Sequence, residues 1–164
     1  MKVLFVNNFR GRGGGEEFLR DLLTGLTAQG VQVGLICRPG TPLEAMFRDS
    51  SVEVFALDRS GARAVTAALT MAKAIRKRGY EIVNIQRGHD IIQSWLAAAL
   101  SGRRPKLMYT PQVPEFLRSR FLLRRMDAIA TISRHIRDGL AAFDPVRAER
   151  TAIVYYGIDL DRFR

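Results

Sequence analysis

Val3-Leu4-Phe5-Val6 opens the chain as a short apolar run, Asn7-Asn8 follows, and the loop Gly11-Arg12-Gly13-Gly14-Gly15 leads into a segment with a helical pattern. This order predicts a buried strand, a glycine-rich turn and a helix. The first backbone N–H groups of a helix have no partner inside it, and the helix dipole makes the same end positive. Glycines let a ligand approach that end without a Cβ in the way. The loop therefore predicts a site for a phosphate or a sugar diphosphate.

The glycine loop departs from two common nucleotide-binding patterns. A dinucleotide fingerprint has glycine at its first, third and sixth positions and an acidic residue at the end of the second strand. Counting from Gly11, the sixth position is Glu16, and the second apolar run, Val31–Cys37, ends at Arg38. An arginine there suits NADP, so an NADP-binding domain stays an alternative, whereas no Gly-Lys-Ser/Thr follows to make a P-loop. A tight turn without a ligand is the third possibility.

The composition is that of one globular domain with a basic excess. The 164 residues are 47% apolar and 26% charged, and the net charge is +10. No apolar stretch approaches the ~18 residues that span a bilayer, and too few apolar residues follow Met1-Lys2 for a signal peptide. We therefore expect a cytoplasmic protein whose lone Cys37 is buried and reduced. The charge predicts an acidic partner, which is a nucleic acid, an anionic membrane face or a phosphorylated substrate.

Apolar runs and helical patterns alternate along the chain. The runs are Val3–Val6, Val31–Cys37, Val52–Leu57, Ile82–Ile85, Lys106–Tyr109, Ala128–Ile132 and Ala152–Tyr155. This alternation is typical of a parallel sheet covered on both faces. We therefore predict an α/β fold, with a doubly wound, mostly parallel, Rossmann-like sheet of about seven strands and helices on both faces.

Two of the predicted helices, residues 62–78 and 90–100, have an apolar stripe at helical spacing. The residues expected to face the sheet are Val65, Leu69, Ala72 and Ile75 in the first helix and Ile92, Leu96 and Ala99 in the second. Ser133 is expected to cap a later helix through its hydroxyl.

Residues 115–126 form a basic amphipathic segment. Its arginines, Arg118, Arg120, Arg124 and Arg125, alternate with Phe116, Leu117, Phe121, Leu122 and Leu123. Such a helix can lie on an anionic membrane with its arginine heads among the lipid headgroups. The alternative is an ordinary helix that covers a strand and has solvated charges.

Four stretches, in order along the chain, carry a family resemblance. They are Gly13-Gly14-Gly15-Glu16, Leu26–Val33, Asp127–Ser133 and Tyr156-Gly157-Ile158-Asp159 followed by Phe163. Together they resemble the N-terminal domain of family 4 glycosyltransferases, which are retaining nucleotide-sugar enzymes with two facing Rossmann-like domains, the GT-B fold. Tyr156 departs from the asparagine that the family has before the last glycine.

The resemblance implies that residues 1–155 are the acceptor-side domain and that residues 156–164 begin a linker to a C-terminal donor-binding domain. These residues alone would then be an inactive fragment. The residues expected to contact the donor phosphates or an anionic acceptor are Gly13, Gly14, Gly15, Glu16, Arg10, Arg12 and Arg87. The resemblance also implies no metal and no cofactor, since the nucleotide-sugar is a substrate.

The catalytic residues are not determined by these patterns, and the candidates are His89, Asp90 and Gln112. Many relatives have a histidine where this chain has Pro111-Gln112, and a glutamine can hydrogen-bond a sugar hydroxyl but cannot take up a proton. Arg87 and His89 follow the fourth strand, at the carboxyl ends where open α/β sheets bind ligands. The structural alternative is that His89 is a loop residue and Asp90 a helix cap.

The function expected is transfer of a sugar from a nucleotide-sugar to a glycan or lipid-linked acceptor of a cell-envelope polysaccharide. The acceptor would be handled at the cytoplasmic membrane face, with residues 115–126 as the docking surface and no nucleic acid partner. Two alternatives stay open, an NADP-binding Rossmann domain and a basic nucleic-acid-binding module whose binding falls steeply with salt.

Overall fold

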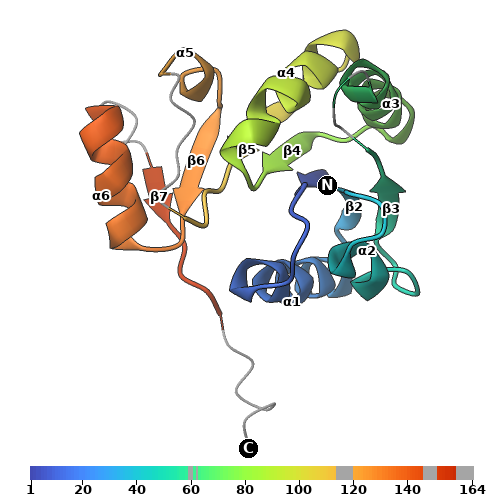
Figure 1. The fold of residues 1–164 in the computed structure, drawn as a ribbon, viewed down its shortest axis with the longest axis horizontal. Helices are drawn as coiled ribbons and strands as arrows, with labels where there is room; N and C mark the ends of the chain where they lie inside the picture. Colours follow the sequence, from blue (N-terminus) through green and yellow to red (C-terminus); the bar gives the residue numbers. More distant parts are fainter. Residues whose placement is uncertain (59–60, 62, 114–119, 146–150, 158–164) are drawn as a thin grey trace, which may run out of the picture.

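Seven parallel strands form one sheet, in the order β3-β2-β1-β4-β5-β6-β7, in the computed structural model (Figure 1), which describes residues 1–58, 61, 63–113, 120–145 and 151–157. The strands are β1 (Lys2–Val6), β2 (Gln32–Cys37), β3 (Glu53–Ala56), β4 (Ile82–Ile85), β5 (Lys106–Tyr109), β6 (Ala128–Thr131) and β7 (Thr151–Ile153). β1 lies between β2 and β4, where Val3 pairs with Val33 on one side and with Ile82 on the other. The predicted α/β fold with a doubly wound parallel sheet is confirmed.

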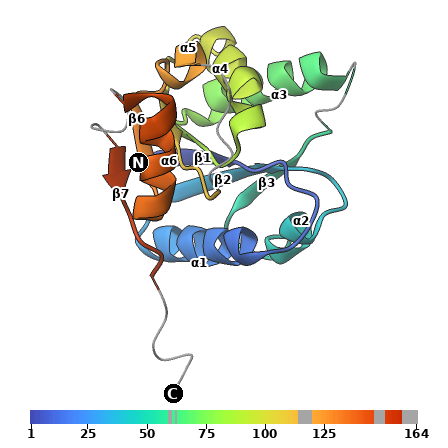
Figure 2. The ribbon, with the colours of Figure 1, turned by 60° about the vertical axis from the view of Figure 1, so that its left-hand side comes forward.

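Helices lie on both faces of this sheet, with α1 and α2 on one side and α3, α4 and α5 on the other (Figures 1 and 2). The helices are α1 (Gly14–Ala28), α2 (Pro42–Met46), α3 (Arg63–Arg78), the 3₁₀ turn η1 (Gly88–Asp90), α4 (Ile91–Leu100), α5 (Arg120–Leu123) and α6 (Arg134–Phe143). Phe5 of β1 packs in a core cluster with Leu19 of α1, whereas its neighbour Leu4 packs in a second cluster with Ile75 of α3. Because successive strand residues point to opposite faces, the two clusters are the two sides of the sheet.

The ends of the helices follow local chemistry. Glu16 and Glu17 in the first turn of α1 complement the positive end of its dipole. Gly30, just past the end of that helix, has a φ of +78°, a left-handed conformation that favours glycine. The Ser133 hydroxyl accepts a hydrogen bond from the Ile136 backbone N–H at 3.3 Å, so the predicted cap of α6 is confirmed.

The outward faces of α3 and α4 differ from the prediction. Val65 and Leu69 of α3 are 68% and 54% exposed, Ile92 and Leu96 of α4 are 46% and 40% exposed, and Ala99 is also exposed, so these residues were wrongly predicted to face the sheet. The buried residues are Ala67, Ala68, Met71, Ala72, Ala74 and Ile75 in α3 and Ile91, Ser94, Ala97 and Ala98 in α4. The physical reason is that α3 and α4 pack against each other as well as against the sheet, and small side chains permit that close approach.

The basic segment at residues 115–126 is only partly within the described residues, since residues 114–119, Arg118 among them, lie outside. The described part contains α5, a single turn. Arg120 Nε donates to the Phe143 carbonyl at 2.8 Å, and Arg124 Nε donates to the buried Asp144 carboxylate at 3.2 Å. These two arginines therefore tie α5 to the end of α6, although both side chains are exposed, as expected for solvated charges. None of the helices within the described ranges is both long and apolar enough to cross a bilayer.

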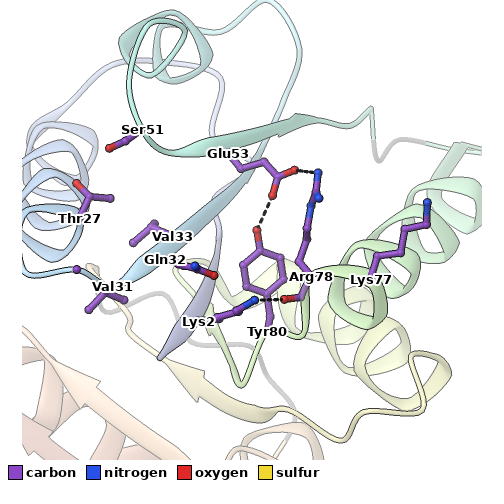
Figure 3. A pocket seen from close by; sticks show the side chains of 11 residues that line it. Lys2, Thr27, Val31, Gln32, Val33, Ser51, Glu53, Lys77, Arg78 and Tyr80 are labelled. Atoms are coloured by element: carbon purple, nitrogen blue, oxygen red, sulfur yellow. Dashed lines mark hydrogen bonds and ion pairs between the residues drawn. The ribbon is translucent and has the colours of Figure 1, made fainter.

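A hollow of about 630 Å³ lies at the amino-terminal edge of the sheet, between the starts of β1, β2 and β3 and the end of α3 (Figure 3). Arg78 forms an ion pair with Glu53, and the Tyr80 hydroxyl donates to the same carboxylate at 3.3 Å. Lys2 Nζ donates to the Arg78 carbonyl at 3.0 Å. These contacts join the first strand, the third strand and the end of α3, which is a structural role.

Gly34→Ala is expected to lower the free energy of unfolding by about 1–3 kcal/mol, a typical cost of overpacking a core. A Cβ at residue 34 would lie 2.1 Å from the Tyr80 hydroxyl oxygen and 2.6 Å from its Cζ. Tyr80 is buried and bonded to Glu53, so its ring cannot move aside freely. Urea denaturation measures the loss. Gly25→Ala is the control, because a Cβ there meets nothing within 4 Å, and equal stability of the two variants would contradict the prediction.

Candidate functional site

The candidate site lies at the carboxyl edge of the sheet, beside neighbouring strands β1 and β4. The chain leaves β1 toward α1 on one face and leaves β4 toward α4 on the other face. Where connections diverge in this way, the loops leave a crevice, and open α/β sheets bind ligands there. The topology brings together the glycine loop, the residues after β4 and the residues after β5.

The glycine loop presents the amino end of α1. Gly13 is the N-cap, and its carbonyl accepts from the N–H of Glu16 at 3.1 Å and of Glu17 at 3.2 Å. Among the described residues outside the helix's own backbone, nothing would lie within 4 Å of a Cβ at Gly14, so the backbone there is open to a ligand. A Cβ at Gly15 would lie 1.9 Å from Oε1 of Gln112. Of Gly14 and Gly15, only Gly15 lies against a described side chain, and a Cβ there would require Gln112 to move.

Glu16, in the first turn of α1, is buried. Its Oε1 accepts from Asn7 Nδ2 at 3.3 Å and from the Arg87 guanidinium at 3.4 Å. The guanidinium of Arg87 also lies over the Phe9 ring, 4.0 Å from its centroid. A buried carboxylate is tolerated when it is paired and hydrogen-bonded. The structure thus brings Glu16 and Arg87 together as an ion pair that joins the first turn of α1 to the loop after β4.

A chain of amide side chains runs from β4 to the residue after β5. Gln112 Nε2 donates to Gln86 Oε1 at 2.5 Å, and Gln86 Nε2 donates to Asn84 Oδ1 at 2.7 Å. Gln112 Oε1 is buried without a hydrogen-bond donor among the described residues, and so is Oδ1 of Asn8 in the loop after β1. Such acceptors favour ligand hydroxyl groups, because a buried acceptor without a donor costs free energy.

Asp90 is a buried structural carboxylate. Its Oδ2 accepts from the Asn8 backbone N–H at 3.2 Å, which joins the loop after β4 to the loop after β1. Asp90 stands at the N-cap position of α4, as the structural alternative predicted, but its side chain makes no capping hydrogen bond to that helix. His89 is mostly exposed, and its Nε2 lies 3.6 Å from Asp90 Oδ1. Burial raises the pKa of Tyr109, and the nearby Asp90 carboxylate adds to the shift, so this phenol stays protonated.

The two arginines of the loop, Arg10 and Arg12, differ in their contacts. Arg12 is exposed, and its Nε donates to Glu17 at 2.6 Å, so this cation is engaged at the first turn of α1. Arg10 is exposed on the loop itself. Both flank the open backbone of Gly14.

Tyr156 packs on α1 close to the site. Its ring stacks on Phe18 with the centroids 3.7 Å apart, and burial raises its pKa to about 12, with Glu16 contributing. Tyr156, which stands where the family has an asparagine, therefore lies in an apolar contact with Phe18. Residues 158–164, most of the predicted linker, lie outside the described residues.

Sequence reasoning missed Asn7, Asn8, Phe9 and Gln86 as parts of this site. The available signal was their position, since each follows directly on, or within a few residues of, the end of β1 or β4. Polar residues at the carboxyl ends of neighbouring parallel strands are expected to meet at one edge.

Comparison with known structures shows the same fold in several glycosyltransferases. HepE from Anabaena, crystallised with UDP-glucose, aligns with a TM-score of 0.79 at 14% identity, over 98% of this chain and 45% of HepE. A glycosyltransferase from Rickettsia africae aligns with a TM-score of 0.78 at 17% identity, over 99% of this chain and 44% of that one. The lipopolysaccharide outer core galactosyltransferase WaaB aligns with a TM-score of 0.76 at 15% identity, over 97% and 46%. The chain thus spans less than half the length of these proteins.

No curated protein matches the chain in sequence at a significant level. A family model does match, and its description is Glycosyltransferase Family 4, over residues 12–162. That range runs from the glycine loop to the end of the sheet and beyond, and includes each of the strands after β1. The chain therefore belongs to Glycosyltransferase Family 4.

Proposed function

We propose that this chain is the acceptor-side domain of a retaining glycosyltransferase that moves a sugar from a nucleotide-sugar donor to a glycan or lipid-linked acceptor. The acceptor would belong to a cell-envelope polysaccharide and be handled at the cytoplasmic face of the membrane. The donor would be held jointly with a second domain, and no metal or cofactor is required.

The observation that carries this proposal is the open backbone at Gly14. It lies in the first turn of α1, where backbone N–H groups lack partners within the helix. No side chain in the described part of the chain would contact a Cβ there, so a phosphate can approach the main chain closely. Negative charge that develops on a nucleoside diphosphate leaving group would be stabilised by these N–H groups and by the dipole of α1.

The buried polar groups suit a sugar or an acceptor hydroxyl next to that phosphate. The acceptor oxygens of Gln112 and Asn8 have no donor among the described residues, and hydroxyl groups donate to such oxygens. Arg87 offsets the negative charge of Glu16, so a buried carboxylate does not repel an anionic ligand. Gln112 orients a hydroxyl in this scheme and transfers no proton.

The solved relatives support a nucleotide-sugar. HepE is described in complex with UDP-glucose and with UDP, and WaaB as a galactosyltransferase of the lipopolysaccharide outer core. Since this chain covers less than half of each, the donor-binding part of the proposed enzyme is assigned to a second domain.

Residues 1–164 expressed alone are expected to unfold cooperatively and to transfer no sugar, whereas joining them to the donor-binding domain produces transfer. The reason is that this domain offers the phosphates one helix end and few other contacts. Circular dichroism on heating and a panel of UDP-sugars with mass-spectrometric product detection measure the two properties. The anomeric configuration of the product, read by NMR, tests retention.

Sugar transfer by residues 1–164 alone would contradict the assignment of donor binding to a second domain. A product of inverted anomeric configuration would contradict the retaining mechanism. Tight NADP binding, followed by fluorescence, would favour a dinucleotide-binding domain. Binding to nucleic acid that falls steeply with salt, without any response to sugar nucleotides, would favour a nucleic-acid-binding module.

A further inference from the structure

One surface of the domain combines large exposed apolar side chains with basic ones. The exposed apolar residues of α3 and α4 are Val65, Leu69, Ile92, Leu96 and Leu100, and we call this surface the α3–α4 face. α3 and α4 pack side by side, on the side of the sheet away from α1 and α2 (Figure 2). The exposed apolar residues of the two helices therefore lie on the same side of the sheet.

Within each helix, the exposed apolar residues are spaced so that they lie on one side of that helix. Val65 and Leu69 are four residues apart, as are Ile92 and Leu96, and residues at this spacing lie on the same side of a helix. Phe121 of α5 adjoins the face, because the Arg125 guanidinium lies 4.6 Å from the Phe121 ring centroid and 5.8 Å from that of Trp95 in α4. A contiguous apolar patch on a protein surface marks a site of contact with a membrane or a partner.

The charges around the α3–α4 face are positive. The exposed basic residues at the carboxyl ends of the two helices are Lys73, Arg76, Lys77, Arg103 and Arg104. Neither α3 nor α4 contains an acidic residue, and α4 contains no charged residue at all. An apolar surface with a basic fringe is complementary to an anionic lipid bilayer, where apolar side chains enter the interface and cations meet the headgroups.

We infer that the α3–α4 face docks the domain on an anionic membrane, with α3 and α4 lying along the bilayer surface. The inference rests on the proposed function, because docking on a membrane would bring the domain to a lipid-linked acceptor. It assigns docking to α3 and α4 in place of residues 115–126, since Arg120 and Arg124 are engaged with α6.

This orientation brings the candidate site to the bilayer surface. α4 begins at Ile91, directly after the η1 turn that contains His89 and Asp90 and follows Arg87. Ile92 therefore lies one residue into the docking helix and five residues from an arginine of the site. An acceptor whose lipid tail stays in the bilayer would present its headgroup at the carboxyl edge of the sheet.

The test is cosedimentation of the protein with vesicles of phosphatidylcholine and phosphatidylglycerol at low salt. Leu69→Glu combined with Leu96→Glu is expected to weaken partitioning by about tenfold or more, because two exposed apolar contacts are lost and two like charges meet the anionic surface. Both side chains are exposed, so the melting temperature should stay near that of the wild type. Val154→Glu is the matched control, since Val154 is exposed on the other face of the sheet beside Phe18 and Leu22 of α1.

Binding by the wild type and by Val154→Glu, lost in the double variant and reduced by salt, supports the inference. No binding by the wild type, or equal binding by the double variant, overturns the inference. It is also overturned if the wild type binds no vesicles but self-associates, and the double variant does not self-associate. The measurement involves no sugar transfer, so its failure leaves the proposed function standing. Transfer to a soluble acceptor should be the same in the double variant and the wild type.

Discussion

Gly14→Val is expected to reduce sugar transfer by the two-domain enzyme about 100-fold, the effect of losing one preorganised hydrogen-bond donor at a developing charge. The branched side chain would occupy the space through which the donor diphosphate reaches the first turn of α1. No described side chain lies within 4 Å of that Cβ position, so the free energy of unfolding should be unchanged. Steady-state kinetics and thermal melting measure the two effects separately.

Two glycines of the same helix sharpen this experiment. Gly25→Val is the control, because its Cβ would also meet nothing within 4 Å but lies far along α1 from the site, and it should leave transfer unchanged. Gly15→Ala would displace the Gln112 side chain and break its 2.5 Å hydrogen bond to Gln86. We expect it to reduce transfer by repositioning that amide. Full activity of Gly14→Val would show that the loop is only a turn.

Arg124→Met is expected to destabilise the domain by about 1–3 kcal/mol, because it removes the hydrogen bond of an exposed cation to a buried carboxylate. Asp144 is 1% exposed and lies at the end of α6, where Arg124 Nε contacts it at 3.2 Å. α5 would then lose one of its two described arginine bonds to α6. Urea denaturation of the 164-residue domain measures the change.

The ion pair is isolated by a double-mutant cycle. Asp144→Asn removes the buried charge, and its combination with Arg124→Met should cost less than the sum of the two single changes. Arg48→Met, on an exposed arginine, serves as the control and should change stability by less than about 0.5 kcal/mol. Additive effects in the cycle would contradict a direct interaction between Arg124 and Asp144.

The arrangement of the sheet could be predicted because strand and turn signals are local. Apolar runs such as Val3–Val6 and Ile82–Ile85 alternate with helical patterns, and the handedness of parallel connections leaves few topologies for such an order. The position of the glycine loop at the end of the first strand also follows from the sequence. Its placement beside β4 follows from the same topology.

Which face of each helix is buried could not be predicted from the apolar pattern. Leu69 and Leu96 have the spacing of core residues, yet they are exposed, and most of the buried residues of α3 and α4 are alanines. The depth of a helix contact depends on the neighbouring helix, which periodicity within one segment does not describe.

The sequence by itself determined the family, the parallel sheet and the edge at which the site lies, since these depend on the order of short local patterns. Tertiary structure alone decided the partners of individual side chains. It placed Glu16 against Arg87 over a separation of 71 residues, and Gln112 against Gly15. It also turned Arg124 toward Asp144 and left the α3–α4 face outward. The physical reason is that hydrogen bonds and ion pairs require contact between atoms within about 3–4 Å, and only the packed chain brings such distant residues that close.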